Sequence, residues 1–173
     1  QGLAGLESRD QAKTFIYALL YGAGDAKLGS VAGKGAVLGG ELKQRFMSNL
    51  PAFATLRDSI AREAAEWVIE GLDGRKLHIR SEHAALNTLL QSAGAIVMKK
   101  ALQLLEECGR LHLLDYYFVG NIHDEVQAEV RADQADDYGR LAVSCLEAAG
   151  SFYNLNCPLT GEYKVGDSWA DTH

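Results

Sequence analysis

The stretch "HAALNTLLQSAGAIVMKKALQLLEE", residues 83–107, carries a long regular pattern of apolar residues. They recur at intervals of three, four and seven, which is the spacing of one face of an α-helix. The residues are Leu86, Leu89, Leu90, Ala93, Ile96, Val97, Leu104 and Leu105. Because an amphipathic helix is stabilised mainly by packing of its apolar face, other elements must cover this one. We therefore predict that residues 83–107 form the core helix of the fold.

The first seventy residues predict further helices. Helical periodicity runs from about residue 9 to 21, breaks in a segment with seven glycines at residues 22–40, and resumes over residues 41–70 with an interruption near Pro51. The glycine-rich segment is not a nucleotide-binding motif. Its glycines are spaced one residue too wide for GxGxxG, and its Gly-Lys pair is not followed by the Ser or Thr of a P-loop.

Short strands are predicted on both sides of the core helix. An Asp-Gly pair between strand-like flanks in residues 72–80 predicts a hairpin. Residues 116–130 look strand-like, residues 133–149 helical, and residues 159–165 have strand potential. The predicted fold class is α+β, mainly helical, with a small antiparallel sheet. The first hairpin is expected to present three basic side chains on one face: Lys76, His78 and Arg80.

Length and composition limit the class of protein. A chain of 173 residues suggests a single unit, and 47% hydrophobic with 23% charged residues is an ordinary soluble composition. No run of eighteen apolar residues is present, so no membrane partner is expected. The three cysteines fit no CxxC spacing, which argues against a zinc knuckle or disulfide framework. The sequence has neither an initiator methionine nor a secretion signal, and we expect it to be part of a longer chain.

Charge is unevenly distributed along the chain, whose net charge is −6. Residues 1–50 carry six basic and four acidic groups, and residues 71–100 carry five and two. Residues 101–140 carry three basic and nine acidic groups. An enzyme that binds phosphates in one place and divalent cations in another would need such a separation, although solvated helix faces produce it too.

The helix predicted from residue 9 has two distinct sides. At about 100° per residue, one side carries two cations and two aromatic rings at intervals of four: Arg9, Lys13, Tyr17 and Tyr21. The opposite side is apolar: Ala12, Phe15, Ile16 and Leu19. Two cations one turn apart repel each other and the positive end of the helix dipole. A bound polyphosphate would remove both problems, with its sugar and base against the tyrosines. The alternative is a solvated basic helix end with half-buried tyrosines.

A second group of polar residues interrupts the strand-like segment "NIHDEVQAEV", residues 121–130. In one straight strand Asp124 would share a face with apolar residues, where an unpaired carboxylate is costly. Either the chain turns at Asp124 and exposes it at the tip of a hairpin, or a cation compensates it. Together His123, Asp124 and Glu125 offer ligands suited to Mg²⁺, although a polar turn alone would explain them.

A third group lies on the core helix itself. Asn87 and Gln91 are one turn apart at the edge of the apolar face, with Gly94 nearby. Such amides suit base edges or sugar oxygens in a nucleic-acid groove, and small residues let a backbone approach closely. Surface amides beside a tightly packed helix are the alternative.

Three segments together resemble one protein family: "RDQAKTFIYALLYGAG" at residues 9–24, "GLDGRKLHIRSEHAALNTLLQSAGA" at residues 71–95, and "HDEVQ" at residues 123–127. Their order and spacing resemble the later part of the polymerase domain of family A DNA polymerases, in particular T-seven-like phage replicative enzymes. The resemblance runs from about residue 8 to the final "SWADTH". It implies part of a right-hand polymerase fold, with fingers over about residues 8–70 and fingers and palm over about residues 71–173.

The resemblance implies roles in nucleotide binding for the first helix. Arg9 and Lys13 would bind the triphosphate of an incoming dNTP, and Lys13 could protonate the leaving pyrophosphate. Tyr17 would abut the sugar and leave no room for a 2′-hydroxyl. Tyr21 would stack near the templating base, and Gly22 would allow the turn that follows.

The resemblance also implies metal and DNA contacts. Asp124 would ligate Mg²⁺, Glu125 would assist nearby, and His123 would approach the primer terminus. Three further positions match residues that contact the primer-template duplex, largely through the minor groove: Arg75, Asn87 and Gln91.

Another metal-binding aspartate of this family lies upstream of the fingers helix, outside these residues. Because two-metal phosphoryl transfer holds both ions between carboxylates, we expect the Mg²⁺ site to be completed by a carboxylate outside this chain. The isolated chain is expected to be inactive. Its expected partners are primer-template DNA, dNTPs and the N-terminal remainder of the polymerase, in the same chain or a second polypeptide, with a processivity factor as a further candidate. Its expected location is the cytoplasm of an infected bacterial host.

Two other classes of protein are open at this point. An HD pair also occurs in helical metal phosphohydrolases, but these need further histidine ligands on helices, and the remaining histidines show no such arrangement. The second alternative is a non-catalytic DNA-binding or assembly subunit of a split polymerase. Such a subunit would use Asn87 and Gln91 and leave Asp124 idle.

Overall fold

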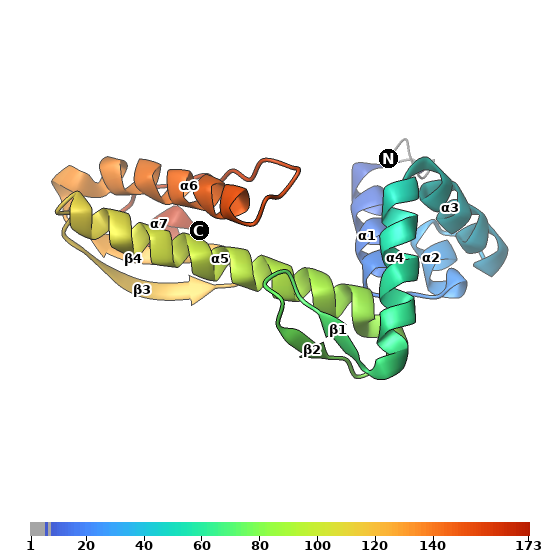
Figure 1. Cartoon of the computed structure of the whole chain (residues 1–173). Coiled ribbons are helices and arrows are strands. Elements are labelled where there is room, and N and C mark those ends of the chain that lie inside the picture. The colour runs from blue at the N-terminus through green and yellow to red at the C-terminus, as the bar shows by residue number, and fades with distance from the viewer. Residues whose placement is uncertain (1–5, 7) are drawn as a thin grey trace. The chain divides into compact units, whose positions relative to one another are not determined.

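The computed structural model describes residue 6 and residues 8–173. The internal contacts of the chain divide it into two compact units, Gln1–Gln91 and Ser92–His173. That the two units belong to a single domain, as the length suggests, remains a prediction. The predicted α+β class is confirmed, because the elements are mainly helices with two small antiparallel sheets (Figure 1). Among the described helices, none is both long and apolar enough to cross a membrane.

Helices make up most of the first unit: α1 (Arg9–Leu20), α2 (Asp25–Val31), α3 (Ala36–Asn49) and α4 (Pro51–Glu63). Helix α1 begins after Ser8, whose side chain accepts a hydrogen bond from the backbone N–H of Gln11 at 3.1 Å. The apolar side of α1 is buried as the spacing predicts. Phe15 is fully buried and meets the edge of Phe46 on α3, with ring centroids 6.2 Å apart.

The predicted break in the glycine-rich segment is wrong, because α2 and the first turn of α3 lie within it. Gly24 and Gly35 are the N-cap residues of the two helices. Gly39 lies where α3 crosses α2, and a Cβ there would be 1.9 Å from the carbonyl oxygen of Asp25. A Cβ at Gly29 would be 2.1 Å from the carbonyl oxygen of Gly35. Glycine therefore allows close backbone packing between these helices, and a pattern of apolar side chains cannot reveal such packing.

The first hairpin is confirmed. Its strands are β1 (Val68–Glu70) and β2 (Lys76–His78), which pair antiparallel with Val68 opposite His78. The helical pattern predicted to residue 70 ends earlier, in the short 3₁₀ helix η1 (Ala64–Glu66), because Trp67 takes a left-handed conformation with φ of 57°. Lys76 and His78 are exposed on one face of β2, while Arg80 lies beyond the strand.

The core helix is confirmed as α5 (Ala85–Leu111), which follows the 3₁₀ helix η2 (Glu82–Ala84). It begins in the residues of the first unit and continues into the second. The rest of the second unit is made of β3 (Tyr116–Ile122), β4 (Glu125–Val130), the 3₁₀ helix η3 (Ala132–Gln134), α6 (Ala135–Phe152) and α7 (Trp169–Thr172).

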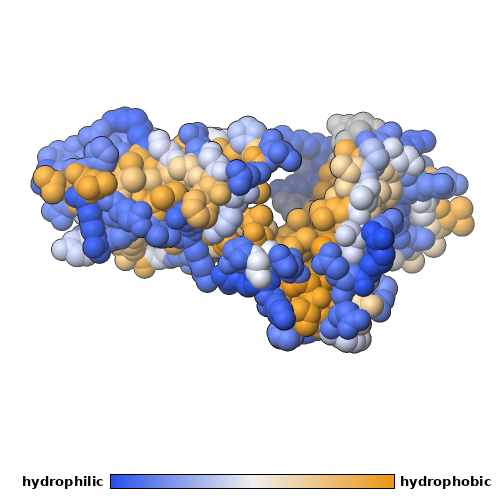
Figure 2. Space-filling view, viewed as in Figure 1, coloured by the Kyte–Doolittle hydropathy of each residue, from blue (hydrophilic) through white to orange (hydrophobic). Residues whose placement is uncertain are grey.

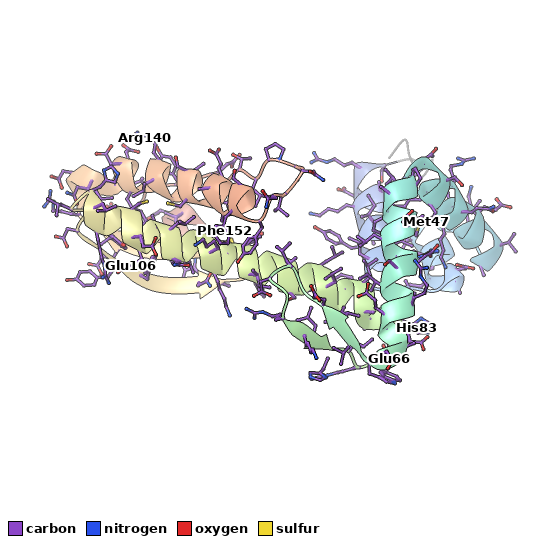
Figure 3. All side chains as sticks on the ribbon, in the orientation of Figure 1. Met47, Glu66, His83, Glu106, Arg140 and Phe152 are labelled. Carbon is purple, nitrogen blue, oxygen red and sulfur yellow. The ribbon has the colours of Figure 1, made fainter. Side chains whose placement is uncertain are left out.

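The second unit has its core where α5, α6 and the β3–β4 hairpin meet (Figure 1). Buried Leu105, Tyr138 and Cys145 come from the two helices, and Tyr116 of β3 packs its ring 4.8 Å from that of Tyr138. The Tyr116 hydroxyl donates a hydrogen bond of 2.7 Å to Glu106 on α5. Glu106 is labelled in Figure 3. Apolar surface also remains along α5 and α6 on the face shown in Figure 2.

The strand predicted for residues 159–165 is wrong. This segment has no regular secondary structure and no strand partner in the part of the chain that is described. Instead it packs on α6: a Cβ at Gly139 would lie 2.2 Å from the ring of Tyr163, and one at Gly150 would lie 3.0 Å from Leu159. The segment therefore packs against glycines of α6 and does not pair with a described strand.

Candidate functional site

The stripe on α1 is exposed. Tyr17 and Tyr21 are 50% and 56% exposed, and their rings stack with centroids 6.5 Å apart and an interplanar angle of 26°. The Nζ atom of Lys13 lies 6.0 Å from the centroid of the Tyr17 ring. Arg9 is exposed at the first residue of the helix. The side of α1 opposite to Phe15 thus presents two cations and two flat rings in a row.

Among the described residues, no ion pair neutralises the positive charge of this stripe. Within residues 6 and 8–173, neither Arg9 nor Lys13 has a carboxylate within salt-bridge distance. Asp10 lies in the first turn, where a negative charge favours the helix dipole. Two free cations beside an exposed aromatic pair can bind an anion that also carries a planar group.

The turn after α1 requires glycine. Gly22 has φ of 77°, and a Cβ there would lie 2.3 Å from the carbonyl oxygen of His83 in η2. The end of α1 therefore contacts the segment leading into α5 (His83 in Figure 3). This contact sets where Tyr21, the residue that caps the helix, lies in the first unit.

The chain turns at Asp124, as one of the two alternatives required. Ile122 pairs with Glu125, so His123 and Asp124 form a two-residue loop between β3 and β4. His123 takes a left-handed conformation with φ of 56°, which histidine adopts more often than most residues. Asp124 is exposed at the tip of the hairpin, so its carboxylate is available to a ligand.

The carboxylate of Glu125 has three partners. Its Oε1 atom accepts hydrogen bonds from the Gln127 side-chain amide and, at 3.0 Å, from the indole N–H of Trp169. Its Oε2 atom lies 3.1 Å from Nδ1 of His173. The hydrogen bond from Gln127, followed by those from Trp169 and His173, lowers the pKa of Glu125 below its ordinary value. Glu125 is therefore held as a carboxylate.

The positions expected to contact DNA lie on the β1–β2 hairpin and on α5. Arg75 donates hydrogen bonds of 2.7 to 2.9 Å to both carboxylate oxygens of Asp73, and this contact lowers the pKa of Asp73. Asn87 is partly buried and Gln91 is exposed, one helical turn further on. All three belong to the first unit.

The residues present fit a divalent cation only in part. Asp124 supplies one exposed carboxylate, but both oxygens of Glu125 are already hydrogen bonded. Across the described positions, no three His, Cys, Asp or Glu side chains are grouped so that they could hold a metal ion. Mg²⁺ accepts few protein carboxylates and keeps waters and phosphate oxygens, so Asp124 suits one ligand position and the remaining protein ligands are not in this group.

The structure brings the predicted residues together in two sets. Arg9, Lys13, Tyr17 and Tyr21 share a side of α1 in the first unit, and the Asp124 turn belongs to the second. If one nucleotide and its Mg²⁺ bind to both sets, Lys13 and Asp124 must lie close together, and this proximity is a prediction. Sequence reasoning missed Trp169 and His173 as partners of Glu125. The signal available for them was the helix-capping pattern Ser168-x-x-Asp171, which predicts a short helix at that point.

The chain is similar to known proteins in sequence and in fold. The sequence model of DNA polymerase family A matches residues 4–171. The DNA-directed DNA polymerase of Enterobacteria phage T3 is 43% identical over 195 residues, which cover 100% of this chain and 28% of that protein. That of Escherichia phage T7 is 43% identical over 192 residues, covering 98% of this chain and 27% of that protein.

A solved structure shows the same fold. It is the POL domain of Pol1 from M. smegmatis in complex with DNA primer-template and dNTP, with a TM-score of 0.74 and 18% identity. The match covers 82% of this chain and 27% of that one. The chain thus spans just over a quarter of the length of these phage relatives. Because the family model matches nearly every residue, the chain belongs to DNA polymerase family A.

Proposed function

We propose that this chain supplies the nucleotide-binding helix, duplex contacts and one metal-binding turn of a DNA-directed DNA polymerase. The reaction is template-directed transfer of a nucleotide from a dNTP to a primer 3′-end, in phage DNA replication in the cytoplasm of an infected bacterium. The observation that carries the proposal is the exposed stripe on α1. It combines stacked rings with two cations that have no ion pair among the described residues, and the opposite side of α1 packs into the core through Ala12, Phe15 and Leu19.

The α1 stripe matches the parts of a nucleoside triphosphate. Arg9 and Lys13 bind the phosphates, because charge-assisted hydrogen bonds to phosphate are strong and neither cation has a competing ion pair among the described residues. Lys13 can also donate a proton to the departing pyrophosphate. Tyr17 lies next along the helix and contacts the sugar, where its ring excludes a 2′-hydroxyl. Tyr21 stacks near the templating base.

The remaining residues orient the primer and the duplex. Asp124 provides a carboxylate for Mg²⁺, which when bound stabilises the charge that develops on the reacting oxygens. His123 lies beside Asp124 in the same two-residue loop, where it can approach the primer terminus. Arg75, Asn87 and Gln91 contact the duplex without reading its sequence, as a copying enzyme requires.

These residues do not polymerise DNA on their own, since one exposed aspartate cannot hold two dications between carboxylates. We propose that a further carboxylate comes from outside this chain, in the same polypeptide or a second one. Primer extension with Mg²⁺ tests this directly. The 173-residue chain alone should extend no primer, and mixing it with an N-terminal polymerase fragment should restore extension. Extension by the chain alone would refute the requirement for a further carboxylate.

One substitution distinguishes a polymerase role from that of a non-catalytic DNA-binding or assembly subunit. Asp124→Ala should abolish extension by the mixture but leave binding to primer-template DNA nearly unchanged. If extension survives Asp124→Ala, the proposed metal role of Asp124 is wrong. If the wild-type mixture binds DNA and never extends a primer, the chain is a non-catalytic DNA-binding or assembly subunit.

A further inference from the structure

Both oxygens of the Glu125 carboxylate have partners, which come from two parts of the second unit. Gln127 lies two residues further along β4, whereas Trp169 and His173 come from α7 and the residue after it. The Oε1 atom takes two hydrogen bonds and Oε2 has one partner. The hydroxyl of Thr172 also donates to the side-chain oxygen of Gln127 at 3.4 Å. Helix α7 and the residue after it therefore contact two side chains of β4, those of Glu125 and Gln127.

Helix α7 is arranged to present these donors. A helix of four residues is not stable by itself, because nucleation is unfavourable. Here Asp171 accepts hydrogen bonds from the backbone N–H of Ser168 at 2.9 Å and from its hydroxyl at 2.7 Å. Trp169 and His173 are four residues apart and thus on one side. Their rings meet edge to face with centroids 6.1 Å apart.

The position of Glu125 affects Asp124, the residue directly before it. Glu125 begins β4 directly after Asp124 and pairs with Ile122 across the loop. A loop of two residues is determined by the strand residues at its ends, so a fixed Glu125 also fixes the backbone of Asp124. The left-handed conformation of His123 requires such support, since it costs roughly 1 to 3 kcal/mol for a non-glycine residue.

We infer that Trp169 and His173 are positioning residues for the Asp124 turn and act on it through the Glu125 carboxylate. This inference rests on the proposed function for its effect on activity. Glu125 serves as the anchor of α7 because its oxygens are occupied, and Asp124 is the carboxylate left open to a ligand. Conservative changes at Trp169 or His173 should therefore alter the backbone position of Asp124 without removing any contact to nucleotide or DNA.

Nuclear magnetic resonance on the 173-residue chain tests the contact independently of activity. The chain has two tryptophans, so the indole N–H signal of Trp67 in the first unit is an internal control. Glu125→Ala should shift the indole N–H signal of Trp169 and leave that of Trp67 in place. Trp169→Phe, which keeps a ring and removes the donor, should shift the backbone amide signals of Asp124. An unchanged Trp169 signal in Glu125→Ala, or unchanged Asp124 signals in Trp169→Phe, would overturn the inference.

Kinetics of the reconstituted polymerase test the consequence. Trp169→Phe and His173→Ala should each lower kcat about 10- to 100-fold, the usual effect of losing a group that orients a metal ligand, with KM for dNTP unchanged. His173→Gln should recover part of the loss, because its amide can donate to Glu125. In a Glu125→Ala background, Trp169→Phe should cause no further loss.

Two results distinguish the inference from the proposed function. If wild-type polymerase extends primers and Trp169→Phe lowers kcat equally with or without Glu125, Trp169 does not act through Glu125 and the inference is wrong. If wild type never extends a primer, the proposed function is wrong, and the resonance measurements still decide whether α7 fixes the turn.

Discussion

Replacing Phe15 by alanine tests the two-sided arrangement of α1. Phe15 is fully buried on the side opposite to the proposed nucleotide contacts and packs against the edge of Phe46. A buried aromatic side chain removes about 150 to 250 Å² from water, which at about 25 cal/mol per Å² corresponds to about 4 to 6 kcal/mol. Alanine keeps a small part of this, and phenylalanine-to-alanine changes in cores cost about 3 to 5 kcal/mol.

We therefore expect Phe15→Ala to lower the free energy of unfolding by about 4 kcal/mol, including the lost edge-to-face contact. Domains of this kind are stable by only about 5 to 15 kcal/mol, so the variant should be close to unfolding at ambient temperature. Urea denaturation followed by far-ultraviolet circular dichroism measures the change. The midpoint should fall with little change in the dependence on urea concentration.

Tyr17→Ala is the matched control, since it removes an aromatic ring two residues further along the same helix. Tyr17 is 50% exposed, so its loss should change the free energy of unfolding by no more than about 1 kcal/mol. Nucleotide binding should show the reverse order, with Tyr17→Ala impaired and natively folded. A loss below about 1.5 kcal/mol for Phe15→Ala, or equal losses for both variants, would refute the assignment of buried and presented sides.

Three further changes have definite outcomes. Gly39→Ala should lower the free energy of unfolding by about 1 to 3 kcal/mol or more, because its Cβ would lie 1.9 Å from a backbone oxygen of α2. Gly40→Ala, the control, should be neutral or stabilising, and equal thermal midpoints for the two variants would contradict this reasoning. Tyr116→Phe should lower the urea midpoint at neutral pH, whereas exposed Tyr117→Phe should not. Burial, with a hydrogen bond to a carboxylate, raises the pKa of Tyr116 from 10.0 to about 12, so its contribution is complete below pH 10 and should disappear as pH rises to about 12. Lys13→Ala should raise KM for dNTP in the reconstituted polymerase about 10- to 100-fold, and an unchanged KM would exclude a phosphate contact.

Local patterns were sufficient for the elements that follow from periodicity or turn chemistry. The spacing of apolar residues predicted α1, its buried side and α5, because side chains three and four residues apart share a helix face wherever the helix lies. The cost of burying Asp124 in a straight strand left two alternatives, a turn at Asp124 or a compensating cation, and the structure has the turn. Each of these conclusions depends only on neighbours in the chain.

The missed elements depend on residues that are distant in sequence. Helix α2 forms, and helix α3 begins, within the glycine-rich segment because the backbones of the two helices pack against each other at Gly39. The segment after α6 does not become a strand, because Tyr163 packs on Gly139 instead of beside another strand.

The sequence by itself determined the family, the helices α1 and α5, and the stripe on α1, since local spacing and the order of the motifs are enough to define them. Only the tertiary structure decided what Glu125 does. Its partner Trp169 is 44 residues away in the sequence, and a hydrogen bond between residues so far apart produces no periodic pattern in the sequence. Hydrogen bonds require donor and acceptor to meet within about 3 Å, and folding alone brings these two groups to that distance.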